Sequence, residues 1–267
     1  ELFDAAASSA LDKLHLFDQQ SISGTLWAYA KLNITAPKLF DAAAHVSIDK
    51  LHKFKPQDIS NTLWAYATLG HSAPKLFKAA VPPTIDNLHK FNEQAISNTL
   101  WAYSKLEHAA PQLFGASAHV ITKKLNSYSS RGISDILYAY AKAGLAYPDL
   151  FNAASRLAVQ KLPTCNSLDI SNILQAYAMT GNSAADLFDE AAKCVISKLH
   201  TFNGPAIANT ISSYAKLGHA SPKLFDAVAT KVTENIHKFT AREISNILWS
   251  YAKSGHYCYD LFDVATK

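Results

Sequence analysis

The sequence predicts an all-α protein, an α-solenoid whose stacked helix-turn-helix repeats form a superhelix. Three observations predict it: a regular 37-residue period, helical spacing of apolar residues within each period, and turn-forming residues between the helical segments. The composition agrees, because 267 residues with 49% hydrophobic and 17% charged side chains supply a large core and exclude a disordered chain.

The dipeptide Leu-Phe marks the period. It recurs every 37 residues from Leu2 to Leu261, without insertion or deletion. We therefore expect one helical-repeat array over residues 1–267, and the lack of polar cap repeats leads us to expect a stretch of a longer or processed array. Its seven full repeats and partial eighth are residues 2–38, 39–75, 76–112, 113–149, 150–186, 187–223, 224–260 and 261–267.

Each repeat contains two predicted helices. In repeat two, apolar residues recur at helical spacing from Phe40 to Phe54 and again from Ile59 to Ala67. No alternating strand pattern bounded by turns is present, so we expect no sheet and about fourteen helices. The predicted core comprises Phe3, Leu14, Phe17, Ile22, Leu26, Tyr29 and their counterparts in the other repeats.

Residues at the helix ends support this division. Helix-capping side chains precede six of the seven second helices, at Asp18, Asn92, Ser129, Asn166, Asn203 and Thr240. Glycines stand where five second helices should end, at Gly70, Gly144, Gly181, Gly218 and Gly255. Prolines then open five of the following repeats, at Pro37, Pro74, Pro111, Pro148 and Pro222.

Two proline sites predict local defects. Pro82 and Pro83 fall in the middle of the first helix of repeat three, where proline removes a backbone hydrogen bond and costs about 3 kcal/mol. We expect that helix to be kinked or split near Val81. We also expect Pro163 to end its helix early.

The sequence lacks the usual signatures of catalysis. Three scattered cysteines exclude a disulfide scaffold, and the eleven histidines recur with the repeat rather than at metal-ligand spacing. No phosphate-binding loop, dinucleotide fingerprint or nucleophile elbow is present. We expect no enzymatic activity, no catalytic residues, no metal and no cofactor. No apolar run approaches the roughly 18 residues that span a bilayer, so no membrane insertion is expected.

Two second-helix segments carry a family resemblance. The runs FKPQDISNTLWAYATLGH and FNEQAISNTLWAYSKLEH resemble heptatricopeptide repeats, the 37-residue relatives of octotricopeptide repeats. Related helical-repeat proteins include RAP and FASTK-like proteins and those of the RNA-editing substrate-binding complex. The resemblance extends over the whole chain, but GISDILYAY, DISNILQAY and AIANTISSY in repeats four to six depart from the pattern, and no RAP domain is present.

This resemblance implies a place and a role. Such proteins act in mitochondria or chloroplasts, and bind organellar RNA for RNA processing, stability, RNA editing or translation. Some are structural subunits of organellar ribosomes. The resemblance therefore implies single-stranded RNA as the partner and a mitochondrion or plastid as the location. Any targeting segment would precede Glu1.

The helical wheel places one row of residues opposite the core in each second helix. In repeat one this row is residues 20, 24, 27 and 31. Over seven repeats the row contains seven basic residues and one acid, Asp135, whereas the outward row of the first helices is balanced. Amides suit base edges, aromatic rings suit stacking, and lysine or arginine suits phosphates. The expected RNA-binding residues are Asn61, Trp64, Asn98, Trp101, Lys105, Arg131, Tyr138, Lys142, Asn172, Asn209, Lys216, Arg242, Asn246, Trp249 and Lys253.

Alternatives remain at each column of this row. The tryptophans could pack between repeats, the asparagines could bond to neighbouring helices in a ladder, and the lysines could be an ordinary solvated face. The competing function is a protein-binding scaffold, an architectural subunit of an organellar ribosome, a photosynthetic complex or another protein complex. A protein partner predicts a continuous apolar patch along the row, whereas RNA predicts the mixture of amides, cations and rings.

Overall fold

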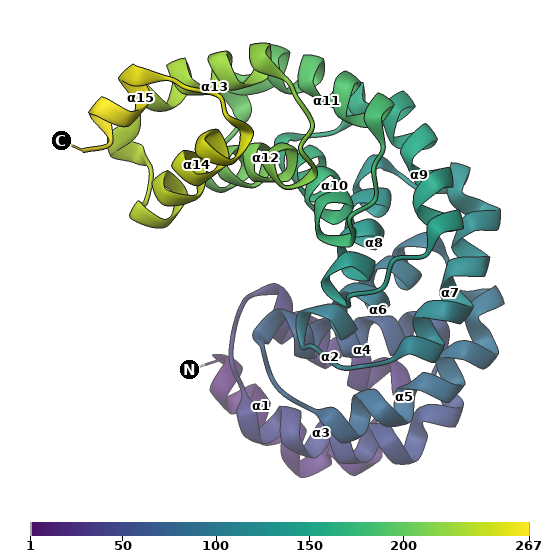
Figure 1. Ribbon diagram of the computed structural model, residues 1–267. Coiled ribbons are helices and arrows are strands. Elements are labelled where there is room, and N and C mark those ends of the chain that lie inside the picture. The colour runs from purple at the N-terminus through teal and green to yellow at the C-terminus, as the bar shows by residue number, and fades with distance from the viewer. Residues whose placement is uncertain (1, 267) are drawn as a thin grey trace. The chain divides into compact units, whose positions relative to one another are not determined.

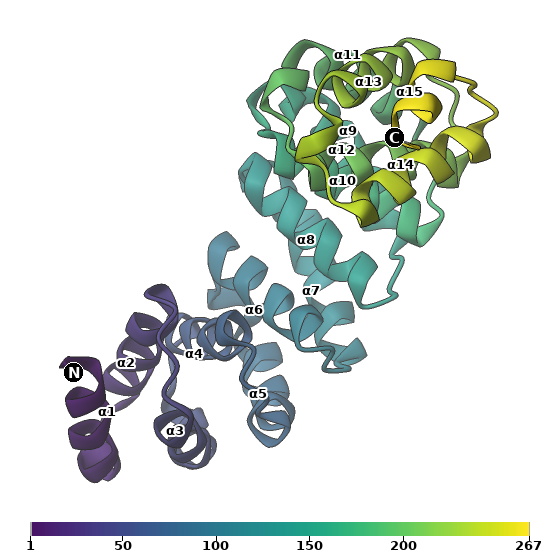
Figure 2. The ribbon, with the colours of Figure 1, turned by 90° about the vertical axis from the view of Figure 1, so that its left-hand side faces the viewer.

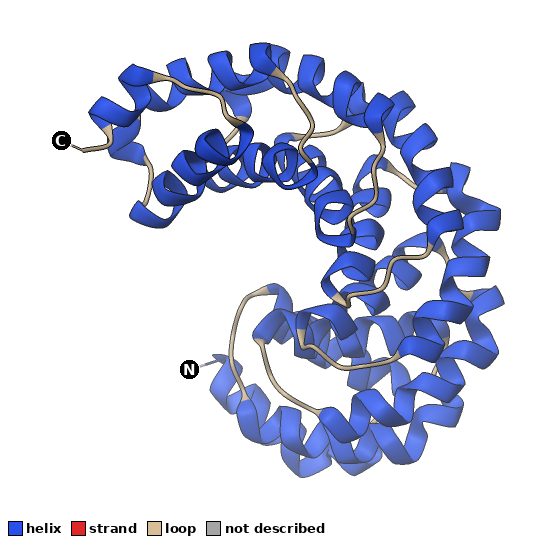
Figure 3. Cartoon of the chain, viewed as in Figure 1, coloured by secondary structure: helices blue, strands red, loops and turns tan. Residues whose placement is uncertain are grey.

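The computed structural model describes residues 2–266, and these residues form α-helices and short 3₁₀ turns without a strand (Figure 3). The all-α prediction is therefore confirmed. The α-helices are α1 (Leu2–Lys13), α2 (Gln19–Lys31), α3 (Pro37–Lys50), α4 (Pro56–Leu69), α5 (Pro74–Asn87), α6 (Glu93–Lys105), α7 (Pro111–Lys124), α8 (Ser130–Lys142), α9 (Pro148–Lys161), α10 (Ser167–Thr180), α11 (Ala185–Lys198), α12 (Gly204–Leu217), α13 (Pro222–Glu234), α14 (Ala241–Ser254) and α15 (Tyr259–Val264).

Seven 3₁₀ turns follow the first helices of the repeats. Each turn ends two or three residues before a second helix begins, so the two helices of a repeat are joined by a tight connection. The turns are η1 (Leu14–Leu16), η2 (Leu51–Lys53), η3 (Leu88–Lys90), η4 (Leu125–Ser127), η5 (Leu162–Thr164), η6 (Leu199–Thr201) and η7 (Ile236–Lys238).

The chain divides into two compact units, with the boundary in the sequence between Lys124 and Leu125. We call them the N-terminal and the C-terminal unit. Within each, the first helices of the repeats form one layer and the second helices the other (Figure 1, Figure 2). The second helices contact one another far more extensively than the first helices do. The second helices therefore form the more tightly packed layer of each unit. They are α2, α4 and α6 in the N-terminal unit and α8, α10, α12 and α14 in the C-terminal unit.

The predicted capping residues begin the second helices. The side chain of Asp18 accepts a hydrogen bond from the Ser21 backbone N–H at 2.8 Å, and Asn92 accepts one from Ala95 at the same distance. Ser129, Asn166, Asn203 and Thr240 cap α8, α10, α12 and α14 in the same way. Each bond satisfies a backbone donor that the first helical turn leaves free. All six predicted caps are confirmed.

The ends of the second helices require a left-handed residue. All five predicted glycines have positive φ, between 64° and 70°, a conformation that costs glycine little. In repeats one and three, Asn33 and Glu107 take this conformation instead, at φ 54° and 57°. The backbone therefore turns in the same way whether or not glycine is present.

A tyrosine-to-backbone bond joins the two helices of a repeat. The Tyr66 hydroxyl donates to the Phe40 carbonyl oxygen at 2.7 Å, and the Tyr66 and Phe40 rings pack edge to face. Burial raises the pKa of Tyr66 far above its usual range, so this hydroxyl remains a donor. The same bond is made by Tyr29, Tyr103, Tyr177, Tyr214 and Tyr251 to the phenylalanines 26 residues earlier.

Most of the predicted core of the seven full repeats is buried, and its half-buried members lie in the first repeat and in the sixth and seventh, where they are Leu199, Ile236, Phe239, Ile244 and Leu248. Leu14, Ile22, Leu26 and Tyr29 are buried, as are most of their counterparts. Phe3 and Phe17 are only half-buried, although Phe40 and Phe54 are buried at the same positions of repeat two. The difference arises because no earlier described repeat packs against α1.

The expected interruption at Pro82 and Pro83 is absent. Helix α5 runs unbroken from Pro74 to Asn87 and has the same length as α3, 14 residues. Pro82 is exposed and Pro83 is half-buried. The carbonyls that lose a backbone donor belong to Lys78 and Ala79, four residues earlier. These two residues are exposed and half-buried as well, so the lost bonds lie on the side of the helix that solvent can reach. The Thr84 hydroxyl also donates to the Ala80 carbonyl at 2.6 Å. The prediction of a split helix was therefore wrong, and the alternative of a kinked helix stays a prediction.

The prediction for Pro163 was also wrong. Helix α9 ends at Lys161 after 14 residues, at the position where α3 ends without a proline. Pro163 lies in the 3₁₀ turn η5, near its start, where a missing N–H costs nothing. The turn occurs in every full repeat, so proline is accommodated by it and does not cause it.

Candidate nucleic-acid interface

The accessible row of the second helices is the candidate site, and we call it the stripe. It consists of four positions per repeat, equivalent to residues 20, 24, 27 and 31. All 28 stripe residues are exposed or half-buried in the structure. In contrast, Ser60, Thr62, Ala65 and Ala67 on either side of the stripe in α4 are buried. Neighbouring second helices thus cover both flanks, so only the stripe remains open to a ligand.

The tryptophan column is shared between packing and solvent. Trp27 and Trp249 are 41% and 47% exposed, whereas Trp64, Trp101 and Tyr138 are half-buried. These rings therefore pack partly against adjacent helices and still offer part of their surface. Aromatic residues in this position can stack on a base without giving up their structural contacts.

The asparagine column does not form the ladder between repeats that was considered as an alternative. Within residues 2–266, the only hydrogen bond of its side chains lies inside α4, where Gln57 Nε2 donates to Asn61 Oδ1 at 2.7 Å. Among residues 2–266, the amides of the other four have no side-chain partner; these are Asn98, Asn172, Asn209 and Asn246. Asparagine is a poor residue in the middle of a helix, and these free amides are available to a ligand.

The cationic column is similarly open. Within the described part of the chain, the amino groups of Lys31, Lys105, Lys216 and Lys253 make no ion pair or hydrogen bond, and neither does the Arg242 guanidinium. All five side chains are exposed. Cations that are not neutralised by nearby carboxylates can attract a polyanion.

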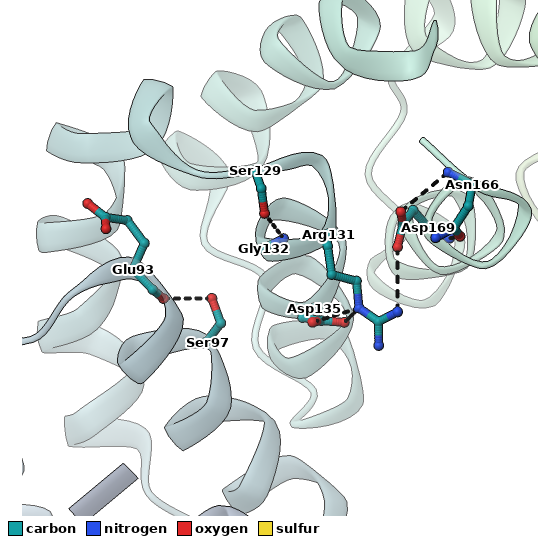
Figure 4. A network of polar contacts seen from close by, with 8 residues as sticks. All are labelled: Glu93, Ser97, Ser129, Arg131, Gly132, Asp135, Asn166 and Asp169. Carbon is teal, nitrogen blue, oxygen red and sulfur yellow. Dashed lines mark hydrogen bonds and ion pairs between the residues drawn. The ribbon is translucent and has the colours of Figure 1, made fainter. Parts of the chain in front are cut away.

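Repeat four contains an ion pair on the stripe (Figure 4). Arg131 Nε lies 3.0 and 2.9 Å from the two carboxylate oxygens of Asp135, one helical turn further along α8. Arg131 Nη1 also lies 3.9 Å from Asp169 Oδ1 on α10. Burial raises the pKa of the Asp135 carboxyl, although Arg131 acts in the opposite direction.

Asp169 is a member of this network that sequence reasoning missed. Its side chain is 5% exposed, and its other oxygen, Oδ2, accepts a hydrogen bond from the Asn166 backbone N–H at 3.4 Å. Asn166 in turn accepts from the Asp169 N–H at 2.9 Å (Figure 4). The spacing of Asn166 and Asp169 is that of a capping box, so the sequence held a signal for this carboxylate, although not for its approach to Arg131.

Repeats five and six interrupt the stripe. In repeat five, Gln175 stands at the aromatic position, and Leu168 and Met179 stand at the first and last positions, so this repeat has neither a ring nor a cation. In repeat six, Pro205 stands at the first position and Ser212 at the aromatic position. Leu168 and Met179 are 47% and 42% exposed. The stripe therefore contains one local apolar interval, between repeats with aromatic and cationic residues.

The histidines lie elsewhere and make structural contacts. His71 Nε2 lies 2.8 Å from Asp41 Oδ1, and the same contact joins His219 to Asp189 and His256 to Asp226. In repeat three, Lys78 replaces the aspartate, and burial lowers the pKa of His108. No cluster of three or more metal-ligating side chains occurs in residues 2–266.

No helix in the described part of the chain is both long and apolar enough to cross a membrane.

Comparisons with known proteins identify one family. The family model described as RNA-editing substrate-binding complex 6 protein matches residues 1–142 and, separately, residues 90–262. Among solved structures, the pentatricopeptide repeat protein PPR10 from maize is similar, with 13% sequence identity and a TM-score of 0.31 over 98% of this chain. The chain spans 45% of that protein's length. No curated protein sequence matches the chain.

Proposed function

The chain belongs to the RNA-editing substrate-binding complex 6 protein family, and from this premise we propose that it binds single-stranded RNA in a mitochondrion or plastid. In this proposal the seven repeats act as one array, and the RNA lies along the stripe. The role is one of binding, in RNA processing, stability, editing or translation, and not of catalysis. The family name supports an association with an RNA-editing complex.

The unpaired cations are the observation that carries this proposal. Lys31, Lys105, Lys216, Arg242 and Lys253 are exposed and without a carboxylate partner in the described chain. The net charge of the chain is only +4, yet Asp135 is the single acid on the stripe. Positive charge therefore gathers on the stripe. Phosphate groups are the ligand that such a row of separated cations fits.

The other stripe residues fit bases. Free asparagine amides both donate and accept hydrogen bonds, as base edges require. The partly exposed rings of Trp64, Trp101 and Tyr138 suit stacking, which contributes about 1–3 kcal/mol per base. Cations, asparagine amides and aromatic rings each occur in five of the seven repeats, at fixed positions of the period. This recurrence supports a modular track for single-stranded RNA.

A scaffold for protein partners is the second candidate function, and one observation favours it. Leu168 and Met179 are exposed apolar side chains on the stripe of repeat five. An architectural subunit of an organellar ribosome or another complex would use such a surface to bind a protein. The apolar interval is confined to one repeat, whereas cations are present in five of the seven, so we favour RNA.

The test is to remove the cations and measure RNA binding. Replacing Lys105, Lys142, Lys216 and Lys253 with alanine should weaken binding to all short single-stranded RNAs alike, because phosphates carry no base information. Each lost phosphate contact should also reduce the slope of log K against log salt by about 0.7. Filter binding at several salt concentrations measures both quantities.

A matched control removes four lysines that lie off the stripe, one in the first helix α7 and three in the 3₁₀ turns that follow first helices. Lys53, Lys90, Lys123 and Lys238 are exposed there, and their replacement with alanine changes the net charge equally. This control should retain most of the salt slope. If the stripe variant binds RNA as tightly as the parent and with the same slope, the stripe does not bind RNA, and the scaffold function should replace this proposal.

A further inference from the structure

Repeat four has a different chemistry at the first two stripe positions. Five of the other repeats carry asparagine at the second position, and repeat one carries glycine. Repeat four has Asp135 there, preceded by Arg131 one turn earlier, and the two form the ion pair of α8. An ionised aspartate only accepts hydrogen bonds and an arginine only donates them, whereas an asparagine amide does both. The pair is thus a more discriminating recognition element than the asparagine of its neighbours.

The ion pair leaves much of its hydrogen-bonding capacity unused. The contact to Asp135 uses the single Nε–H of Arg131, shared between two oxygens at 3.0 and 2.9 Å. The Nη groups retain four N–H donors, since Nη1 only approaches Asp169 at 3.9 Å. The carboxylate retains acceptor sites as well. The Arg131 and Asp135 side chains are 56% and 23% exposed, so a ligand can reach both.

The local structure holds this pair in place. Asp169 is buried within the capping box of α10 and stands beside the Arg131 guanidinium (Figure 4). Arg131 is therefore placed between two carboxylates, Asp135 on its own helix and Asp169 on the next. A side chain that is ordered before binding loses less conformational entropy when a ligand arrives.

A ring and a cation complete the same face of α8. Tyr138 follows Asp135 by three residues, and Lys142 follows Tyr138 by four, so the four stripe residues lie one above another along the helix. Tyr138 is half-buried and Lys142 is exposed. Repeat four therefore combines a donor, an acceptor, a stacking surface and a phosphate-binding group.

Guanine is the base that matches this combination. Its Watson–Crick edge places two adjacent donors, N1–H and N2–H₂, opposite a carboxylate, next to the acceptor O6, which suits a guanidinium. Adenine and cytosine place a ring acceptor beside their amino group, which would face the carboxylate. Uracil offers one N–H between two acceptors. Only guanine therefore supplies two donors to Asp135 and an acceptor to Arg131 together.

We propose that repeat four is a guanine-selective base site, in which Asp135 accepts from N1–H and N2–H₂, Arg131 donates to O6 and Tyr138 stacks on the ring. This inference rests on the proposed function, because it requires RNA to lie along the stripe. It adds a defined base at one position of the bound strand, whereas repeats with asparagine at the second position tolerate more than one base.

The experiment selects bound molecules from a pool of random short single-stranded RNAs with the full chain, and sequences them. The parent should enrich guanine at one position of the bound motif. Asp135→Asn keeps the shape of the side chain and restores the residue of five other repeats; it should lower the preference for guanine at that position about tenfold. Arg131→Gln, which introduces the residue of repeats one to three, should lower it as well. Asp12→Asn removes an equal charge from an exposed site of the first-helix layer and should leave the preference unchanged.

The outcomes separate this inference from the proposed function. If the parent retains RNA without a guanine preference at any position, or if both variants keep that preference, the guanine site is refuted while RNA binding stands. If the parent retains no RNA above background, the proposed function fails and the guanine site fails with it. Helical circular dichroism of each variant verifies that the fold is intact.

Discussion

The N-terminal and C-terminal units have similar residues at their core positions and different residues on the stripe. In the N-terminal unit, Trp27, Trp64 and Trp101 follow one another in consecutive repeats. In the C-terminal unit the same column reads Tyr138, Gln175, Ser212 and Trp249, and the residues around it change from one repeat to the next. The tyrosine-to-phenylalanine bond of the core nevertheless occurs in both units.

This contrast indicates that each repeat separates the residues that fix the fold from a row of residues that varies. Residues that fix the fold lie on the buried faces, where neighbouring helices constrain them in the same way in every repeat. The stripe has no such constraint, so its residues can vary without cost to the core. We infer that the uniform stripe of the N-terminal unit supplies affinity through stacking. The varied stripe of the C-terminal unit, with the Arg131–Asp135 pair, supplies selectivity.

The largest expected effect concerns the equivalent core positions of the two units. Leu63 in α4 and Leu174 in α10 occupy equivalent positions, with exposures of 1% and 0%. Replacing either with alanine should lower the free energy of unfolding by about 2–5 kcal/mol, because a cavity forms in the core. The two costs should agree within about 1 kcal/mol. Urea unfolding of the full chain, followed by circular dichroism, measures them, and a negligible cost in one unit would break the comparison.

The next effect tests the difference on the stripe. Replacing Trp64 and Trp101 together with leucine retains apolar bulk between the helices but removes the stacking rings. Affinity for single-stranded RNA should fall by about 1–3 kcal/mol for each base that loses its ring. The equivalent change in the C-terminal unit, Gln175→Leu, removes no ring and should cost less than either tryptophan. Equal losses in the two units, measured by filter binding, would contradict a stacking role for the N-terminal unit.

Much of the fold could be predicted because the repeat amplifies weak local signals. A single capping residue or glycine indicates little, but Asn92, Asn166 and Asn203 at one position of the period define a helix start. The prediction of a split at Pro82 and Pro83 failed because it treated one helix by itself. Pro82 lies on the exposed side of α5, and only the three-dimensional packing shows which side that is.

The candidate site could be predicted in part. Helical periodicity identified the exposed stripe because a helix packed on three sides leaves one row open. It could not identify the contact between Arg131 and Asp169, since this joins neighbouring repeats and depends on how α8 and α10 pack. The exposure of Trp64 and Trp101 could not be predicted from the sequence either. Helical spacing fixes the direction of a side chain, whereas its exposure depends on the adjacent helix.

Ultraviolet crosslinking of the full chain to short single-stranded RNA, followed by mass spectrometry of the crosslinked peptides, tests the central claim most directly. The account predicts crosslinks on the second helices, at Trp64, Trp101 and Lys105 in the N-terminal unit and at Tyr138 and Lys142 in the C-terminal unit. Recovery of crosslinks chiefly away from the stripe, at Lys123 in α7 and at Lys53 and Lys90 in the 3₁₀ turns, would contradict it.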